Sequence, residues 1–145
     1  MAKAPVQPGE ILAHKYRVDR VLGQGNMGVV VAATHLELGQ RVALKFMLGN
    51  HAISKDQRER FQREARAVVR LNSHHVAHVL DMGVLENDAP YIVMEFLEGK
   101  DLSVLLTEDG PLPFDRAVEY VLQACEALGE AHTAGIVHRD IKPAN

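Results

Sequence analysis

The stretch that indicates the fold is Gly23-Gln24-Gly25-Asn26-Met27-Gly28-Val29-Val30. Glycines at this spacing occur in ordinary tight turns, in dinucleotide-binding folds and in flaps over phosphate groups, so the pattern alone decides little. A dinucleotide fold needs a helix after the third glycine, with its N-terminus facing a pyrophosphate. Residues 29–34 are instead strand formers, several of them β-branched. We therefore predict a hairpin of strand, glycine turn and strand, whose backbone, lacking Cβ atoms at the glycines, lies close over phosphates.

Further strands and one helix are predicted around this hairpin. Alternating or β-branched segments between turn-forming residues indicate five strands, at residues 16–22, 29–34, 40–46, 77–84 and 91–95. A helix over residues 55–71 interrupts them, and Ser54 with Gln57 three positions later has the form of a capping box at its start.

The character of the chain changes to helical after Gly99. Asp101 is placed to cap a short helix that runs through Leu106, and a break at residues 110–113 precedes a longer helix over residues 114–134, closed by Gly135. Apolar residues at helical spacing predict one face of the longer helix: Phe114, Ala117, Val118, Val121, Leu122, Cys125, Leu128 and Ala131. We expect an irregular leader over residues 1–14, a first domain over 15–98 and a second region over 99–145.

Composition bounds the class of protein. At 145 residues and 47% hydrophobic, the chain has enough apolar material for the core of one ordinary domain. The net charge of −3 argues against a nucleic-acid partner. A single cysteine allows no internal disulfide and fits a reducing, cytoplasmic compartment. No segment is long and apolar enough for a signal peptide or a membrane span.

Lys45 and Glu64 are candidates for a charged pair. Lys45 and Ala43 share one face of their strand because side chains alternate with a period of two. The alternative, a surface lysine, stays open on the motif alone. In the helix over 55–71, Phe61, Val68 and Leu71 define an inward stripe on which Glu64 falls. An unpaired buried carboxylate is costly, so we expect Glu64 to have a cation as its partner.

The segment His138-Arg139-Asp140-Ile141-Lys142-Pro143-Ala144-Asn145 gathers chemically useful groups. It supplies an acid that accepts a proton, a cation two residues later and an amide oxygen that holds a metal. By contrast, His74, His75 and His78 have no cysteine or clustered carboxylate near them in the sequence. We interpret those histidines as a loop rich in imidazole rather than a metal site.

Taken together, these motifs resemble the eukaryotic-like protein kinases. The glycine hairpin, Lys45, Glu64, residues 94–99 and residues 138–145, here named the catalytic loop, occur in the family's order and rough spacing. Lys142, two residues after Asp140, is typical of the serine/threonine kinases. The sequences of the glycine hairpin and of the helix over 55–71 are similar to those of the bacterial branch. The resemblance implies an α+β, protein-kinase-like fold: a small lobe with a five-stranded antiparallel sheet and one main helix, then the first helices and catalytic loop of a helical large lobe.

The resemblance also implies ATP and Mg²⁺ as cofactors and a protein with a Ser or Thr acceptor as substrate. Asp140 would accept the hydroxyl proton, Lys142 would neutralise the moving phosphoryl group, and Lys45 would meet the α- and β-phosphates. Asn145 would ligate Mg²⁺. The residues implied to bind the nucleotide are Leu22, Gly23, Gly25, Gly28, Val30, Ala43, Lys45, Glu64, Met94, Glu95, Leu97 and Asn145.

Two other functions remain open. One is a non-catalytic nucleotide-binding or dimerising module, because the family's Asp-Phe-Gly metal ligand comes after the point where this sequence ends. For the same reason we expect these residues by themselves to be inactive. The other is a phosphotransferase for small molecules on a related fold, against which the Lys142-Pro143 pair weighs. The apolar face of the helix over 114–134 is expected to cause self-association.

Overall fold

The computed structural model describes residues 6–25, 28–48 and 53–145, and the chain divides into two compact units. Unit 1 comprises Met1–Val69 and His78–Leu97, and unit 2 comprises Arg70–Ala77 and Glu98–Asn145. The change from strands to helices near Gly99 therefore falls close to the third crossing between the units, at Leu97 to Glu98. The short segment Arg70–Ala77 groups with the helices, which the predicted ranges 15–98 and 99–145 do not separate.

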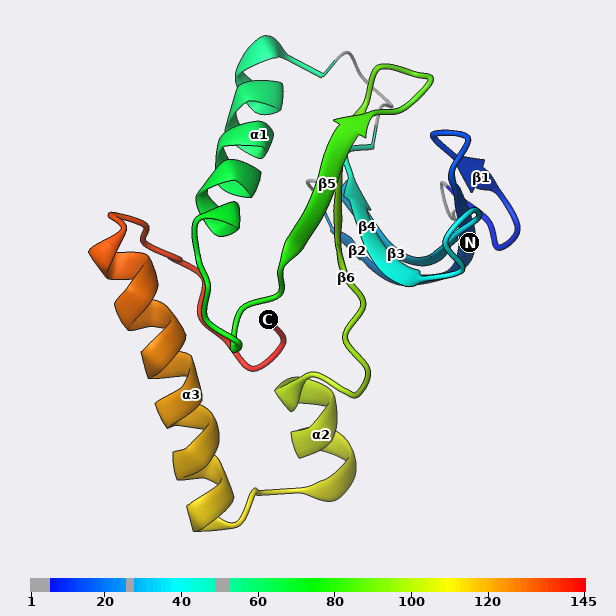
Figure 1. The fold of residues 1–145 in the computed structure, drawn as a ribbon. Coiled ribbons are helices and arrows are strands. Elements are labelled where there is room, and N and C mark those ends of the chain that lie inside the picture. The colour runs from blue at the N-terminus through cyan, green and yellow to red at the C-terminus, as the bar shows by residue number, and fades with distance from the viewer. Residues whose placement is uncertain (1–5, 26–27, 49–52) are drawn as a thin grey trace. The chain divides into compact units, whose positions relative to one another are not determined.

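Unit 1 is built on an antiparallel sheet with the strand order β1-β2-β3-β4-β6-β5 in the described residues (Figure 1). The strands are β1 (Ile11–Leu12), β2 (Tyr16–Gly25), β3 (Gly28–His35), β4 (Arg41–Phe46), β5 (Val79–Val84) and β6 (Pro90–Glu95). All five predicted strands are confirmed, with small shifts at their ends. The prediction of five strands is one short, because the sheet has six.

The additional strand, β1, lies within the predicted irregular leader. Its Leu12 pairs with Tyr16 and is buried, while Ala13 and His14 between them have φ angles of 49° and 53°. The N–H of Lys15 donates to the carbonyl of Leu12 at 3.1 Å, so Ala13 and His14 are the central residues of a β-turn with positive φ at both positions. Asn-Gly or Asp-Gly is the usual sequence signal of such a turn. Ala-His lacks that signal, which explains why a strand of two residues escaped prediction.

The two faces of the sheet are packed to different extents. One face holds the main core, in which Val18, Val29, Val31, Leu44 and Val93 are almost completely buried. Each such side chain contributes about 1.5–3 kcal/mol relative to an exposed one. The opposite face is covered in part by α1 (Lys55–Val69), whose Phe61 and Ala65 pack on Ile92. The sheet therefore has one densely packed face and one face that α1 covers only in part.

The start of α1 confirms the predicted capping box. The backbone N–H of Ser54 donates to Gln57 Oε1 at 2.9 Å, and the N–H of Gln57 donates to Ser54 Oγ at 3.2 Å. Two N–H groups that lack partners in the first turn are satisfied in this way.

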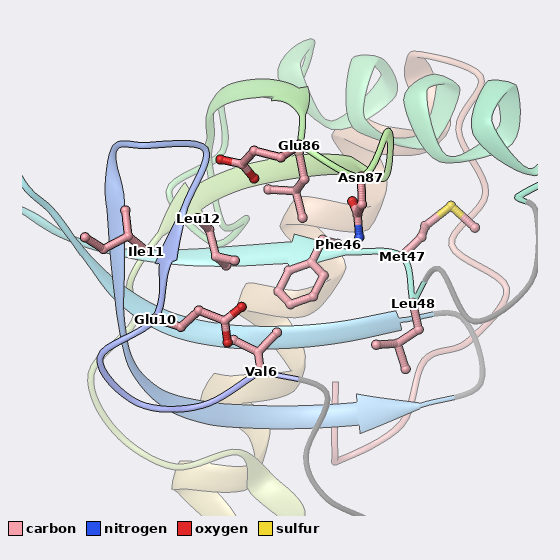
Figure 2. A pocket seen from close by; sticks show the side chains of 10 residues that line it. Val6, Glu10, Ile11, Leu12, Phe46, Met47, Leu48, Glu86 and Asn87 are labelled. Carbon is pink, nitrogen blue, oxygen red and sulfur yellow. The ribbon is translucent and has the colours of Figure 1, made fainter.

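A cavity of about 260 Å³ lies in unit 1 between the N-terminal segment, the end of β4 and the turn after β5. Figure 2 shows Leu12 and Phe46 among its apolar side chains and Glu10 and Glu86 among its polar ones. Phe46 and Lys45 are neighbours in β4, so they point to opposite faces of the sheet. Phe46, which lines this cavity, therefore lies on the face of the sheet opposite to Lys45.

Unit 2 contains α2 (Leu102–Asp109) and α3 (Phe114–Thr133). Asp101 Oδ1 accepts the N–H of Val104 at 2.9 Å, which confirms the predicted cap. Glu130 of α3 accepts the N–H groups of Asn72 and Ser73 at 2.7 and 2.8 Å. Through this carboxylate, α3 holds the segment Arg70–Ala77 within unit 2.

The predicted apolar face of α3 is mostly exposed. Phe114, Val121 and Leu122 expose 85, 61 and 63% of their surface, whereas Ala131 is buried. Cys125, predicted on the same face, is also exposed, so it is not part of a core. The reason is that the periodicity identifies an apolar face without supplying a partner that covers it. None of the described helices is both long and apolar enough to cross a membrane.

Candidate active site

The glycine hairpin joins β2 to β3, and its three glycines play different parts. Gly25 pairs with Gly28 and Gly23 pairs with Val30, while the expected tip at residues 26–27 lies outside the described residues. A Cβ atom on Gly28 would meet the carbonyl oxygen of Phe46 at 2.2 Å, so only glycine fits. A Cβ on Gly23 or Gly25 would meet nothing within 4 Å. The fold therefore requires the third glycine, whereas open space lies beside the other two.

The strand that follows Gly28 excludes a dinucleotide fold, which needs a helix at this point. The hairpin prediction is confirmed in the residues that the structure describes.

The register of the sheet brings several predicted residues onto one face. Val30 pairs with Lys45 across β3 and β4, and Ala43 pairs with Met94 across β4 and β6. Directly paired residues point to the same side of a sheet, and residues two apart in one strand do so as well. A cation thus stands on the same face as three apolar side chains. Leu22, also predicted for the site, is 41% exposed and lies at the irregularity in β2 between Val21 and Gly23.

The expectation that Glu64 faces the interior is wrong in this structure. Glu64 is exposed, and among residues 6–25, 28–48 and 53–145 no ion pair within 4.0 Å joins it to Lys45. The buried face of α1 is set by Phe61 and Ala65, and Glu64 is turned about 100° from Ala65 around the helix axis. The Nζ atom of Lys45 lies 6.0 Å from the centroid of the Phe61 ring. A pairing of Lys45 with Glu64 stays a prediction.

The end of β6 has a polar arrangement that the sequence did not reveal. Glu95 Oε1 accepts the backbone N–H of His78 at 2.8 Å and lies 2.9 Å from His78 Nδ1. The backbone hydrogen bond, followed by that from the side chain, lowers the pKa of Glu95 and keeps its carboxylate ionised. We had interpreted His78 only as one of a cluster of imidazoles. A separation of 17 positions in sequence carries no local signal for this contact.

The catalytic loop is held by hydrogen bonds that converge on Asp140. Lys142 Nζ and Asn145 Nδ2 donate to Asp140 Oδ2 at 2.9 and 2.8 Å. The hydrogen bond from Lys142 and then that from Asn145 lower the pKa of Asp140, so the carboxylate is charged at neutral pH. Asn145 Nδ2 also donates to the Asp140 carbonyl at 2.8 Å, and Arg139 adopts a φ of 63°. The predicted acid, cation and amide are thus brought together.

This donor set fits the cofactors that the resemblance implies. A carboxylate and an amide oxygen are the hard ligands that Mg²⁺ prefers, and Asn145 uses its Nδ2 in the bonds to Asp140, which leaves Oδ1 as the atom for a metal. In unit 1, the open space beside Gly23 and Gly25 admits close approach of a phosphate to the backbone. The candidate residues belong to two units: the glycine hairpin and Lys45 lie in unit 1, and the catalytic loop lies in unit 2.

Comparison with known proteins identifies the family. The model for the protein kinase domain matches residues 16–145. The chain belongs to the protein kinase family. The serine/threonine-protein kinase pkn3 of Myxococcus xanthus is 44% identical over 139 residues, which cover 94% of this chain and 25% of the relative. A probable serine/threonine-protein kinase PknB of Corynebacterium glutamicum is 41% identical, with 93% of this chain and 21% of the relative covered. The kinase chain therefore spans about a fifth to a quarter of these relatives.

Solved structures support the same assignment. The crystal structure of the Mycobacterium tuberculosis PknI kinase domain matches with a TM-score of 0.76 and 32% identity, covering 97% of this chain and 56% of that one. The protein-kinase fold inferred from the sequence is confirmed, apart from the strand count.

Proposed function

We propose that the protein containing this chain transfers the γ-phosphoryl group of ATP to Ser or Thr hydroxyls of proteins. The observation that carries the proposal is the convergence of Lys142 and Asn145 on the ionised Asp140 within a kinase-family chain. An ionised carboxylate held by two donors is a suitable acceptor for the hydrogen bond, and then the proton, of an attacking hydroxyl.

In this proposal unit 1 binds the nucleotide. Lys45 pairs with the α- and β-phosphates, and Val30, Ala43 and Met94 supply the apolar surface for the adenine. Gly23, Gly25 and Gly28 let the hairpin backbone lie over the phosphates, with Leu22 beside them. Backbone groups of Glu95 and Leu97 pair with the adenine edge. Glu64, which is not paired with Lys45 in this structure, pairs with it when ATP is bound.

Unit 2 supplies the groups for phosphoryl transfer. Asp140 orients the hydroxyl and accepts its proton, and Lys142 neutralises charge on the phosphoryl group. Asn145 would hold Mg²⁺, and the ion would supply positive charge that neutralises the phosphates. Asp140, Lys142 and Asn145 occupy the positions of the acid, the cation and the amide in the family's motif.

Cellular setting and self-association are part of the same proposal. We propose that this domain acts in the cytoplasm, where ATP and protein substrates are present. The exposed Phe114, Val121 and Leu122 favour association between copies of the chain. A monodisperse monomer in light scattering contradicts the second statement.

The decisive experiment follows phosphate transfer from γ-labelled ATP to a protein acceptor such as casein, using the full-length protein. Asp140→Asn keeps the shape of the side chain but removes the charge, so transfer should fall by about 10²–10⁴-fold. Lys45→Met should lower transfer by a similar factor, because it removes the cation that pairs with the α- and β-phosphates. Lys55→Met is the control, because Lys55 is exposed and, among the described residues, its ion pair is with Glu59 at 3.8 Å.

Two outcomes contradict the proposal. Transfer by Asp140→Asn at the wild-type rate removes Asp140 from the chemistry. Transfer to an aminoglycoside but not to Ser or Thr of any protein favours a small-molecule phosphotransferase instead.

A further inference from the structure

We propose that His78 is a positioning residue for the adenine base, because it holds Glu95 and thereby the segment over residues 94–97. This inference rests on the proposed function, in which backbone groups of that segment pair with adenine. His78 directly precedes β5, and Glu95 is the last residue of β6.

Three polar contacts join His78 to Glu95. The backbone N–H of Glu95 donates to the His78 carbonyl at 3.0 Å, and the backbone N–H of His78 donates to Glu95 Oε1 at 2.8 Å. His78 Nδ1 lies 2.9 Å from the same oxygen. A carboxylate only accepts, so Nδ1 carries a proton in this arrangement. The backbone bond extends the ladder between β5 and β6, whereas the other two act on the side chain of Glu95.

These side-chain contacts do more than close the sheet. Val79 and Met94 are already paired, so the ladder reaches the end of β6 without help from an imidazole. What His78 adds is a fixed place for the Glu95 carboxylate. Without this contact the Glu95 side chain would sample several rotamers, and the backbone groups that pair with adenine would move with it. The geometry points to a role in holding the base-reading segment still.

The next residue of the segment is held from the other side. The guanidinium carbon of Arg41, the first residue of β4, lies 4.2 Å from the centroid of the Phe96 ring. This is within the range of a cation–π interaction. β6 lies between β4 and β5 in the sheet, so Arg41 at the start of β4 and His78 just before β5 contact two successive residues of the segment.

The contacts between His78 and Glu95 lie close to two points where the chain crosses between the units. After leaving unit 1 at Val69, the chain returns to it at His78 and leaves it again after Leu97. His78 begins one stretch of unit 1, and Glu95 lies two residues before that stretch ends. The pair therefore ties together the two ends of the β5–β6 hairpin, through bonds made inside unit 1.

The test compares His78→Ala with His78→Asn in the full-length protein. Asn offers an amide N–H near the place of Nδ1, so it should restore what Ala removes. For His78→Ala we expect the KM for ATP and the Kd of ATP·Mg²⁺ to rise about three- to tenfold, as loss of one hydrogen bond to a charged group implies. The value of kcat should change little. His74→Ala is the matched control, since His74 is an exposed histidine four positions earlier.

Inorganic tripolyphosphate with Mg²⁺ separates positioning of the base from a general structural effect. It carries the phosphates without a base, so its binding to His78→Ala should equal binding to wild type. Glu95→Gln is a second variant that keeps the acceptor oxygen but loses the charge, and it should weaken ATP binding less than His78→Ala does. Near-ultraviolet circular dichroism verifies that each variant is folded.

Equal affinity of wild type and His78→Ala for ATP overturns the inference while leaving the proposed function intact. Equal weakening of ATP and tripolyphosphate also overturns it, because the effect is then structural. If wild-type protein binds no ATP, the proposed function fails and this inference fails with it.

Discussion

The sheet of unit 1 and the catalytic loop of unit 2 are held by opposite kinds of interaction. In the sheet, Val30, Ala43 and Lys45 are placed by pairing with distant strands over a buried core. In the loop, Asp140 is placed by hydrogen bonds from residues two and five positions away, all of them exposed. The residues proposed to bind the nucleotide thus depend on the stability of a whole unit, whereas those proposed for phosphoryl transfer depend on local geometry.

The largest effect that sharpens this comparison is expected from Leu44→Ala. Leu44 is completely buried in the core under the sheet, and truncation should cost about 2–5 kcal/mol of unfolding free energy through lost burial and a cavity. Urea unfolding of the protein followed by circular dichroism measures this. Leu122→Ala is the control, because Leu122 is 63% exposed and its truncation should cost under about 0.5 kcal/mol. Equal losses for both variants would break the comparison.

A smaller effect is expected from Gly28→Ala. The added Cβ would overlap the Phe46 carbonyl oxygen, and moving β3 away from β4 should cost about 1–3 kcal/mol. Gly25→Ala adds the same methyl group to open space, so it should leave stability within about 0.5 kcal/mol and weaken ATP binding instead. Unfolding and nucleotide titration are measured on both variants. A destabilised Gly25→Ala with unchanged ATP affinity contradicts this division of roles.

Within unit 2, Glu130→Ala should have an intermediate effect. Removing the carboxylate leaves the N–H groups of Asn72 and Ser73 without their acceptor. We expect a loss of about 1–2 kcal/mol, because water replaces part of the interaction. Hydrogen exchange should show faster exchange at these two amides. Glu119→Ala, on the same helix, leaves both amides unaffected; protected amides in Glu130→Ala argue against the anchoring role.

The smallest effect on stability is expected in the catalytic loop itself. Lys142→Ala removes the first cause of the lowered pKa of Asp140, so that pKa should rise toward its ordinary value of 3.8. A lowered pKa in the folded protein gives a contribution that is present above the ordinary value and is lost as pH falls through the folded value. Since Asp140 is fully exposed, the pH dependence of stability should barely change.

Carbon-13 nuclear magnetic resonance of the Asp140 carboxyl measures this pKa directly. A midpoint below 3.8 in wild type that moves upward in Lys142→Ala is the expected result. An unchanged midpoint shows that Lys142 does not hold Asp140 in solution.

Much of the fold could be predicted because its signals are local. The hairpin strands after Gly28, the capping box at Ser54 and the cap at Asp101 depend on residues within a few positions of one another. The strand β1 was missed because Ala13 and His14 form its turn without a turn signature. The inward position of Glu64 was wrong because helical periodicity leaves the edge of a buried stripe uncertain by one residue.

The sequence by itself determined the family, the order of the elements other than β1, and the charged and amide groups of the catalytic loop, since these reside in short motifs. Only the tertiary structure decided that Gly28 touches the backbone of Phe46 while Gly25 touches nothing, and that Glu64 is exposed. It also revealed the contact between His78 and Glu95. The physical reason is that strand pairing and helix packing join residues far apart in the chain, and the energy of those contacts belongs to the pair rather than to either local sequence.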